Sequence, residues 1–325
     1  MGINREQALD CFQSDDLVGI GMEADAVRRL LHPEGVVSYA IDRSISCAGP
    51  LSGGTPRPGD ACVDSLCAEI GETIEAGGTG VRIRSGFGGA DRGGIVGIEW
   101  FEGLFRGIRQ RFPSIWIEGL SAADVVSIAQ GCGLGLRETI ARLRDAGLDS
   151  IAGDGVDLAE VDGQGRAGWP RCSVAEWLEV HRTAHGLGMR TSAAMIFGAG
   201  ETMEQRVDFL EAVRRLQEET GGFTAFVSVA AEAPGGRELD GVTAVERLKT
   251  LAISRMFLDN IDNVQASAAG QGLKVLQMGL RFGGNDVGSV SLEGAGSEED
   301  VRRIIRDAGF QPAQRDAAYR TMFLN

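Results

Sequence analysis

The sequence predicts an α/β fold, a (β/α)8 barrel of the TIM type that forms a single domain over residues 1–325. Eight short apolar runs alternate with segments of helical periodicity, and no change in composition or low-complexity linker interrupts them. A doubly wound open sheet would also alternate strands with helices. Eight regular units without a break favour closure into one barrel.

A helical N-terminal extension, residues 1–35, precedes the barrel. Apolar residues recur at helical spacing over 5–31, and His32-Pro33-Glu34-Gly35 ends the helix. The barrel covers residues 36–290. Residues 291–325 form a C-terminal helix, predicted over 297–308, and a polar tail.

The strands and helices of the barrel follow from the same alternation. The predicted strands cover 36–41, 81–85, 115–119, 149–153, 190–197, 225–229, 264–268 and 286–290. The predicted helices lie within 63–76, 99–111, 121–146, 173–187, 202–219, 242–260 and 272–281. Capping-box patterns open three of them, at Ser121-x-x-Asp124, Ser173-x-x-Glu176 and Thr202-x-x-Gln205.

The composition favours a protein that acts on small molecules. The chain is 43% hydrophobic and carries a formal net charge of −14, whereas nucleic acids and anionic membranes both require a basic face. We therefore expect a small-molecule substrate and no nucleic-acid or membrane partner. The N-terminus lacks a signal-peptide pattern, so we expect a cytoplasmic location. The oligomeric state is open, a homo-oligomer included.

Polar residues at the C-terminal ends of the strands are candidate site residues, because ligands of such barrels bind there. This rim is strongly acidic. Glu118, Glu232 and Asp286 are carboxylates suited to hold a cation or to act as a general base. Arg84 would neutralise them or bind a substrate anion. Each could instead face solvent or belong to a structural ion pair.

Many segments resemble the radical S-adenosylmethionine enzymes of the futalosine route to menaquinone, above all the dehypoxanthine futalosine cyclases and aminofutalosine synthases. The matching segments cover most of the chain: 31–37, 41–43, 57–60, 146–151, 176–180, 182–185, 195–198, 218–226, 257–261 and 307–310. The resemblance implies a barrel of the radical S-adenosylmethionine type and an adenosyl ligand.

The resemblance also implies particular binding residues. The apolar strand and Gly-x-x-Glu turn over 195–201 match the family's seat for adenine. This implies adenosyl contacts for Met195, Phe197, Gly198 and Glu201. Asp157 stands at the family's Glu position after the fourth strand and would accept hydrogen bonds from the ribose, while Gly86 would contact the methionine end. Glu201 could instead favour a helix N-terminus, and Asp157 could be solvated.

The loop after the first strand departs from the family. The family carries Cys-x3-Cys-x2-Cys there, and its three thiolates hold three irons of a [4Fe–4S] cluster, leaving the fourth for S-adenosylmethionine. In this chain the loop is shorter and runs Cys47-Ala48-Gly49-Pro50-Leu51-Ser52-Gly53-Gly54-Thr55. We therefore expect no [4Fe–4S] cluster and no reductive cleavage of the sulfonium.

The cysteines allow a second interpretation. Cys47, Cys62 and Cys67 could hold a cluster of unusual spacing. Cys67 shares a helical stripe with Ile70 and Ile74, however, which favours buried core thiols.

Two further patterns are weaker. The Gly-rich segment 49–59 could wrap its amides around an anion, or it could be a shortened connection. His181 and His185 have the spacing of two zinc ligands, but no His-Glu-x-x-His pattern accompanies them, so we expect no metal. Gln265, a polar residue near the seventh strand, could tie the barrel together.

These observations predict an enzyme without radical chemistry, namely a cyclase, transferase or lyase of specialised (natural-product) biosynthesis. It would bind S-adenosylmethionine or a related adenosyl nucleoside and run a redox-neutral cyclisation, group transfer or elimination. Glu118 or Glu232 would be the base, and Arg84 would bind a substrate anion. Two alternatives stay open: a non-catalytic relative that binds a metabolite or partner protein, and a radical enzyme with the unusual cysteine cluster.

Overall fold

The computed structural model describes residues 2–47, 61–85, 97–156, 158, 172–233, 237–238, 242–267, 272–291 and 297–324. Contacts divide the chain into two compact units. Unit 1 comprises Met1–Ala40 and Ser192–Asn325, and unit 2 comprises Ile41–Thr191. Within the described ranges, no helix has the length and apolar character that crossing a membrane requires.

Unit 2 is built on four parallel strands in the order β4-β3-β2-β1. These strands are β1 (Val36–Cys47), whose first residues belong to unit 1, β2 (Gly80–Ser85), β3 (Trp116–Ser121) and β4 (Ser150–Ala152). Its helices are α3 (Ala61–Glu75), α4 (Ile98–Arg111), α5 (Ala122–Cys132), α6 (Leu136–Ala146) and α7 (Val174–Gly186).

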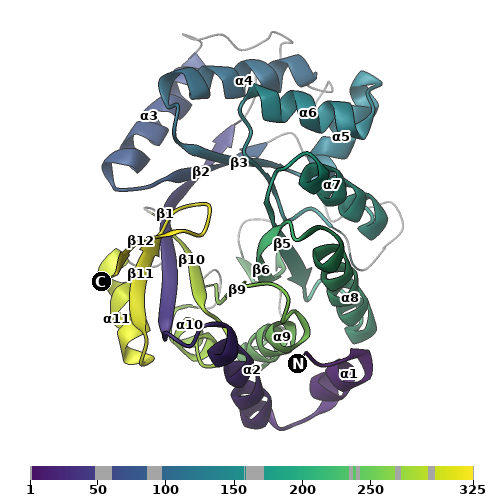
Figure 1. Cartoon of the computed structure of the whole chain (residues 1–325), viewed down its shortest axis with the longest axis vertical. Coiled ribbons are helices and arrows are strands. Elements are labelled where there is room, and N and C mark those ends of the chain that lie inside the picture. Colours follow the sequence, from purple (N-terminus) through teal and green to yellow (C-terminus); the bar gives the residue numbers. More distant parts are fainter. Residues whose placement is uncertain are drawn as a thin grey trace. The chain divides into compact units, whose positions relative to one another are not determined.

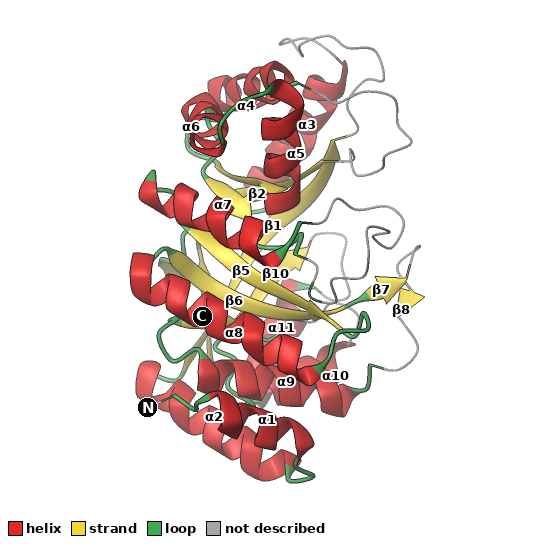
Figure 2. Cartoon of the chain, turned by 90° about the vertical axis from the view of Figure 1, so that its right-hand side faces the viewer, coloured by secondary structure: helices red, strands yellow, loops and turns green. Residues whose placement is uncertain are grey.

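Unit 1 continues from the start of β1 in the order β1-β10-β9-β6-β5. Its strands are β5 (Thr191–Phe197), β6 (Phe223–Ala230), β9 (Asn263–Gln265) and β10 (Asp286–Ser291), and β7 (Glu232–Ala233) pairs separately with β8 (Arg237–Glu238). Its helices are α1 (Arg5–Gln13), α2 (Leu17–Leu31), α8 (Met203–Thr220), α9 (Ala244–Phe257), α10 (Gly272–Gly279) and α11 (Glu298–Asp307). Helix α9 packs on β6 and β9, and α8 lies beside α9 (Figure 2).

The strand order confirms the predicted fold class. Each of the eight predicted strands is present in the described residues, and barrel strands that follow one another in the chain are neighbours within each unit (Figure 1). This sequential order, with a helix after most strands, is that of a (β/α)8 barrel. The three predicted capping boxes are also present, since Ser121, Ser173 and Thr202 each exchange both hydrogen bonds with the residue three positions later.

The N-terminal helix predicted over 5–31 is two helices. Helix α1 ends at Gln13 and α2 begins at Leu17. The side chain of Asp16 accepts a hydrogen bond from the Gly19 N–H at 2.8 Å. A cap at this position starts a new helix, which apolar spacing alone does not reveal.

The tail predicted after α11 contains two strands that the sequence analysis did not assign. Residues 311–324 form a C-terminal hairpin of β11 (Gln311–Arg315) and β12 (Thr321–Leu324), and β11 pairs in parallel with β1, Gln311 opposite Val36. The sequence analysis assigned no strand here because β11 is polar in composition. Gln314 and Arg315 are nevertheless only 9% and 6% exposed.

Candidate functional site

The turn after β5 holds the residues predicted to bind the adenosyl group. Gly198 and Gly200 have φ angles of +80° and +109°, in the left-handed region that favours glycine. A Cβ on Gly198 would lie 2.2 Å from Val242 Cγ2, so only glycine fits. The Glu201 carboxylate accepts hydrogen bonds from the N–H groups of Gly198 at 2.6 Å and Ala199 at 2.8 Å. The turn therefore has a fixed backbone shape.

Glu201 is also the buried partner of an arginine on α8. Arg206 Nε lies 2.8 Å from Glu201 Oε1, and the Glu201 side chain is 1% exposed. The same guanidinium donates to Glu246 on α9 at 2.7 Å and lies 4.9 Å over the Phe197 ring. Both Glu201 oxygens are thus engaged by the protein, so the geometry gives this residue a part in shaping the turn.

The side chains of Met195 and Phe197 are 0% and 1% exposed. Ile196, between them, is half-buried and projects from the opposite face of the strand, because successive side chains alternate. The structure therefore places Ile196 and the backbone of the turn, rather than Met195, on the more accessible side of β5.

Arg82 and Glu118 form the central ion pair of unit 2. Arg82 Nε donates to Glu118 Oε1 at 2.6 Å, and the two side chains are 38% and 19% exposed. They are register partners on β2 and β3, so both project from the same face of the sheet. The carboxylates of Glu118, Asp42 and Asp154 raise the pKa of Arg82 above its ordinary value. Three carboxylates thus act on one guanidinium, which suits a cationic ligand group.

The other face of β1 carries a separate ion pair. Arg43, next to Asp42, donates to Glu72 on α3 at 2.6 Å and lies 3.7 Å from Glu69. Because neighbouring side chains alternate, Asp42 stays on the face of Arg82. Arg84, the predicted cation of the site, is exposed near the end of β2. The structure places Arg82 against Glu118 instead.

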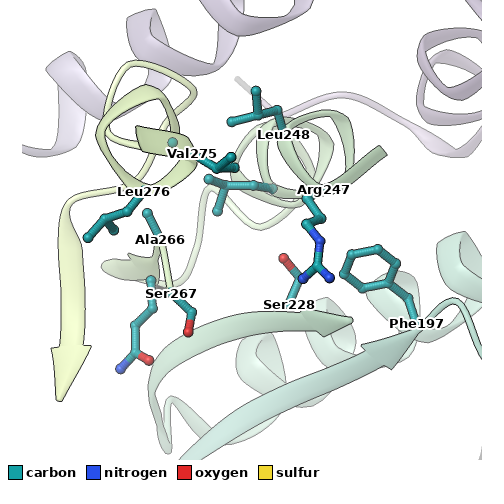
Figure 3. Close-up of a pocket in the computed structure, with 11 residues that line it drawn as sticks. Phe197, Ser228, Arg247, Leu248, Ala266, Ser267, Val275 and Leu276 are labelled. Carbon is teal, nitrogen blue, oxygen red and sulfur yellow. The ribbon is translucent and has the colours of Figure 1, made fainter. Parts of the chain in front are cut away.

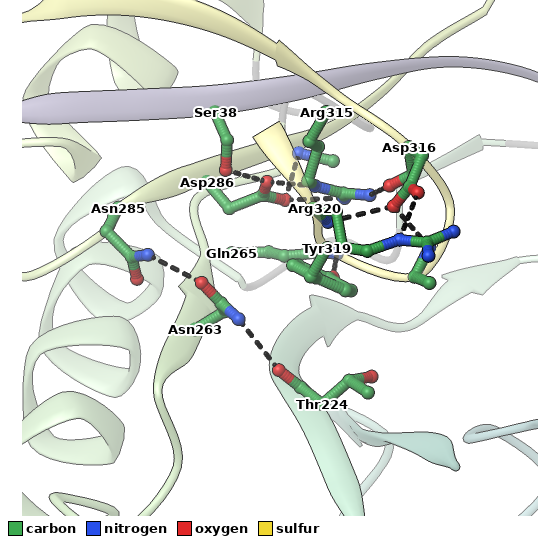
Figure 4. Close-up of polar contacts among 12 residues, drawn as sticks. Ser38, Thr224, Asn263, Gln265, Asn285, Asp286, Arg315, Asp316, Tyr319 and Arg320 are labelled. Atoms are coloured by element: carbon green, nitrogen blue, oxygen red, sulfur yellow. Dashed lines mark hydrogen bonds and ion pairs between the residues drawn. The ribbon is translucent and has the colours of Figure 1, made fainter. Parts of the chain in front are cut away.

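Asp286, the third predicted rim carboxylate, lies in a buried network of unit 1 (Figure 4). It is 0% exposed, and its two oxygens accept from Arg315 Nε at 2.5 Å and Arg315 Nη2 at 2.9 Å. The Ser38 hydroxyl donates to it at 2.5 Å and the Gly288 N–H at 2.7 Å. This arrangement ties β1, β10 and the C-terminal hairpin together, so the geometry favours a structural role for Asp286.

Several predicted positions lie outside the described residues. These are Gly86, Asp157, the Gly-rich segment 49–59 and the side chains of Glu232 and Cys62. Their assigned roles stay predictions.

The two histidines of the possible zinc pair share one hydroxyl. His181 Nδ1 and His185 Nε2 each lie 2.9 Å from Thr191 Oγ1. Burial lowers the pKa of His181 well below its ordinary value and that of His185 to about 4. No group of three potential metal ligands comes together in the part of the chain that the structure describes. The pair therefore fits a neutral, structural contact.

A pocket lies at the ends of β5, β6 and β9 in unit 1 (Figure 3). Its polar lining residues are Ser228, Arg247, Gln265 and Ser267, and its apolar ones include Phe197 and Leu248.

The sequence prediction included Phe197 and noted Gln265, but it missed Ser228 and Arg247, which lie inside a strand and a helix. It missed Arg82 for the same reason, because candidates were sought only just after strands. Alternation along β2, which puts Arg82 and Arg84 on one face, was the available signal.

Comparisons with known proteins give a consistent result over the whole chain. A family model for the CofH/MqnC C-terminal region matches residues 235–324. Cyclic dehypoxanthine futalosine synthase of Streptomyces coelicolor is 33% identical, over 98% of this chain and 85% of that protein. Aminodeoxyfutalosine synthase of Thermus thermophilus is 31% identical, over 97% of this chain and 91% of that protein.

A solved structure supports the fold alone. The crystal structure of HydG, a maturase of the [FeFe]-hydrogenase, superposes with a TM-score of 0.68 at 14% identity, covering 98% of this chain and 74% of that one.

Proposed function

Because this chain belongs to the family of the cyclic dehypoxanthine futalosine and aminodeoxyfutalosine synthases, in the radical S-adenosylmethionine superfamily, we propose that it binds S-adenosylmethionine or a related adenosyl nucleoside. The preformed turn after β5, braced by Glu201, supports this proposal. We also propose that the reaction is a redox-neutral cyclisation, group transfer or elimination, in a specialised biosynthetic pathway.

The main support for a redox-neutral reaction is the altered sequence of the loop after β1. Counted from Cys47, the family's cysteine spacing would require cysteines at positions 51 and 54, where this chain has Leu51 and Gly54. The next cysteine is Cys62. Cys47 and Cys67 are buried, and the cysteine spacing of this loop differs from the family's, which supports a reaction without the family's cluster. No step below uses one.

A bound sulfonium would supply a carbon electrophile whose C–S bond breaks with both electrons leaving on sulfur, as a neutral thioether. In a transfer, the substrate nucleophile forms the new bond at that carbon and gives up its proton. Glu118 is our proposed acceptor for that proton, with Arg82 holding the carboxylate in place at 2.6 Å. The step needs no electron donor. Glu232 is the other candidate base, and Arg84 is the candidate for a substrate anion.

Calorimetric titration of the full chain with S-adenosylmethionine, S-adenosylhomocysteine and methylthioadenosine tests the adenosyl proposal. We expect at least one of the three to bind, and Asp157→Ala to weaken that binding about tenfold, as for loss of a hydrogen bond to a charged acceptor. Asp145→Ala, which removes an exposed carboxylate on α6, is the matched control and should bind like the parent. If none of the three compounds binds, the adenosyl proposal is wrong. Binding without turnover of any nucleophile would favour the non-catalytic alternative.

A further inference from the structure

Gln265, the last residue of β9, turns its side chain away from the helices of unit 1. Ala266, which continues the strand, faces them, because a Cβ added to Gly279 of α10 would lie 3.0 Å from the Ala266 Cβ. Side chains of a strand alternate between its two faces, so Gln265 lies on the opposite, inner face. Its register partners Val227 and Asp286 share that face.

The C-terminal hairpin fixes the orientation of the Gln265 amide on this face (Figure 4). Gln265 Nε2 donates a hydrogen bond to the Tyr319 hydroxyl. The Arg315 guanidinium lies 3.7 Å from the centre of the Tyr319 ring, and two hydrogen bonds to the buried Asp286 carboxylate hold Arg315. The amide is thus oriented by a chain of contacts that begins in a closed ion pair.

The backbone of the hairpin turn is specialised for this contact. Tyr319 has φ +64°, in the left-handed region that bulky side chains rarely adopt. Asp316 holds the turn, since its carboxylate accepts hydrogen bonds from the N–H groups of Ala318 at 2.9 Å and Arg320 at 2.8 Å. An unfavourable backbone conformation that the surroundings maintain is a reason to look for a function. Here that function is the placement of the Tyr319 hydroxyl.

The Gln265 amide has hydrogen-bonding capacity that its neighbours do not use. A glutamine side chain has two N–H donors and a carbonyl oxygen. Among the residues that the structure describes, Tyr319 is the one hydrogen-bond partner of this half-buried side chain, which leaves the oxygen and the second N–H for a ligand. Gly288, at φ +78°, keeps the space beside the oxygen clear, because an added Cβ would lie 3.1 Å from Gln265 Oε1.

We propose that Gln265 is a specificity-determining residue that pairs with a ligand edge in which a hydrogen-bond donor stands next to an acceptor, as in a lactam or an aminopurine ring. Tyr319 is its positioning residue. A planar amide complements such an edge with two hydrogen bonds, as glutamine does with adenine in nucleic acids. An aminopurine would be the adenine of the proposed adenosyl ligand, in which case the inference rests on the proposed function. A lactam would belong to a second substrate.

Calorimetric titration of the full chain with two pairs of nucleosides tests the proposal and separates the two sources. Inosine carries the lactam, and 1-methylinosine lacks the lactam N–H. Adenosine carries the aminopurine edge, and N6,N6-dimethyladenosine lacks its N–H groups. We expect one unmethylated nucleoside to bind at least about tenfold more tightly than its methylated counterpart, as for loss of two neutral hydrogen bonds. Preference for inosine identifies a second substrate, and preference for adenosine identifies the adenosyl ligand.

Variants assign this preference to particular residues. Gln265→Met, which keeps the length of the side chain and removes its donors and acceptor, should reduce the preference to less than about threefold. Gln265→Glu, which removes the N–H groups, serves if Gln265→Met does not fold, and should reduce it as well. Tyr319→Phe keeps the ring beside Arg315 and should reduce the preference severalfold. Gln130→Met, on an exposed glutamine of α5, is the matched control and should keep it.

The absence of binding by both inosine and adenosine would overturn the proposal, as would a preference that persists in the Gln265 variants. An unchanged preference in Tyr319→Phe would overturn the positioning role. The preference is a ratio of two affinities, so a loss of stability alone does not change it. Adenosine binding that does not depend on Gln265 would overturn this assignment and leave the adenosyl proposal standing, so the two proposals can fail separately.

Discussion

The two main charged clusters of the molecule differ in how completely their charges are matched. In unit 1, Asp286 faces Arg315 through two hydrogen bonds, with further bonds from Ser38 and Gly288, and the two ionic side chains are 0% and 6% exposed. In unit 2, Arg82 is under the influence of three carboxylates, and its side chain is 38% exposed. The first cluster is closed and balanced, and the second is open and acidic.

This difference separates a structural cluster from a candidate site. A buried ion pair whose carboxylate oxygens are all hydrogen-bonded has no atom left to bind a ligand. Removing one partner leaves the charge of the other buried without compensation. An accessible cluster with excess charge contributes little to stability and gains from a ligand of opposite charge. Glu118 and Asp286 were both predicted as rim carboxylates from the sequence. The structure favours a structural role for Asp286, and Glu118 stays a candidate site residue.

The largest effect is expected for Asp286→Ala. The substitution leaves the Arg315 guanidinium buried without its partner and should lower the free energy of unfolding by about 3–5 kcal/mol. Urea unfolding followed by circular dichroism measures this. A loss below about 1 kcal/mol would show that the unit 1 cluster is not the structural tie described.

Glu118→Gln should change ligand affinity strongly and stability little, the opposite of what is expected for Asp286→Ala. We expect the free energy of unfolding to change by less than about 1 kcal/mol, because the pair is partly exposed. Affinity for S-adenosylmethionine should fall about tenfold, as for loss of one charge-assisted contact, while affinity for S-adenosylhomocysteine, whose sulfur is neutral, changes less. Parallel titrations measure both. An equal loss for both ligands would show that the cluster does not recognise the sulfonium charge.

A smaller effect, on the pH dependence of stability, is expected for the buried pair His181 and His185. Burial lowers both histidine pKa values in the folded chain, that of His185 to about 4 from an ordinary 6.5. Between these values the unfolded chain binds more protons than the folded one, so stability should fall as pH drops from about 6.5 toward 4. Above 6.5 the pair should contribute no pH dependence.

Urea unfolding at pH 7, 6 and 5 measures this slope. His185→Gln should reduce it, whereas His32→Gln, which removes a histidine that contacts the Asp262 carbonyl, is the matched control. An identical slope in His185→Gln and the parent would contradict the assignment.

The barrel was largely predictable from the sequence because its strands are apolar and its helices begin with capping residues such as Ser121, Ser173 and Thr202. Strand β11 was not, because Gln314 and Arg315 are polar, and the burial of Arg315 depends on a distant partner, Asp286. The candidate site was predictable in part. Glu118 followed from its place near a strand end, but its pairing with Arg82 depends on the register between β2 and β3.

The most direct test of the redox-neutral proposal is a search for reductive cleavage. The full chain, treated anaerobically with iron and sulfide, is incubated with dithionite and S-adenosylmethionine, and 5′-deoxyadenosine is quantified. We predict no 5′-deoxyadenosine above the protein-free control, because Leu51 and Gly54 stand where the family's spacing requires cysteines. Formation of one or more equivalents per chain would contradict the proposal.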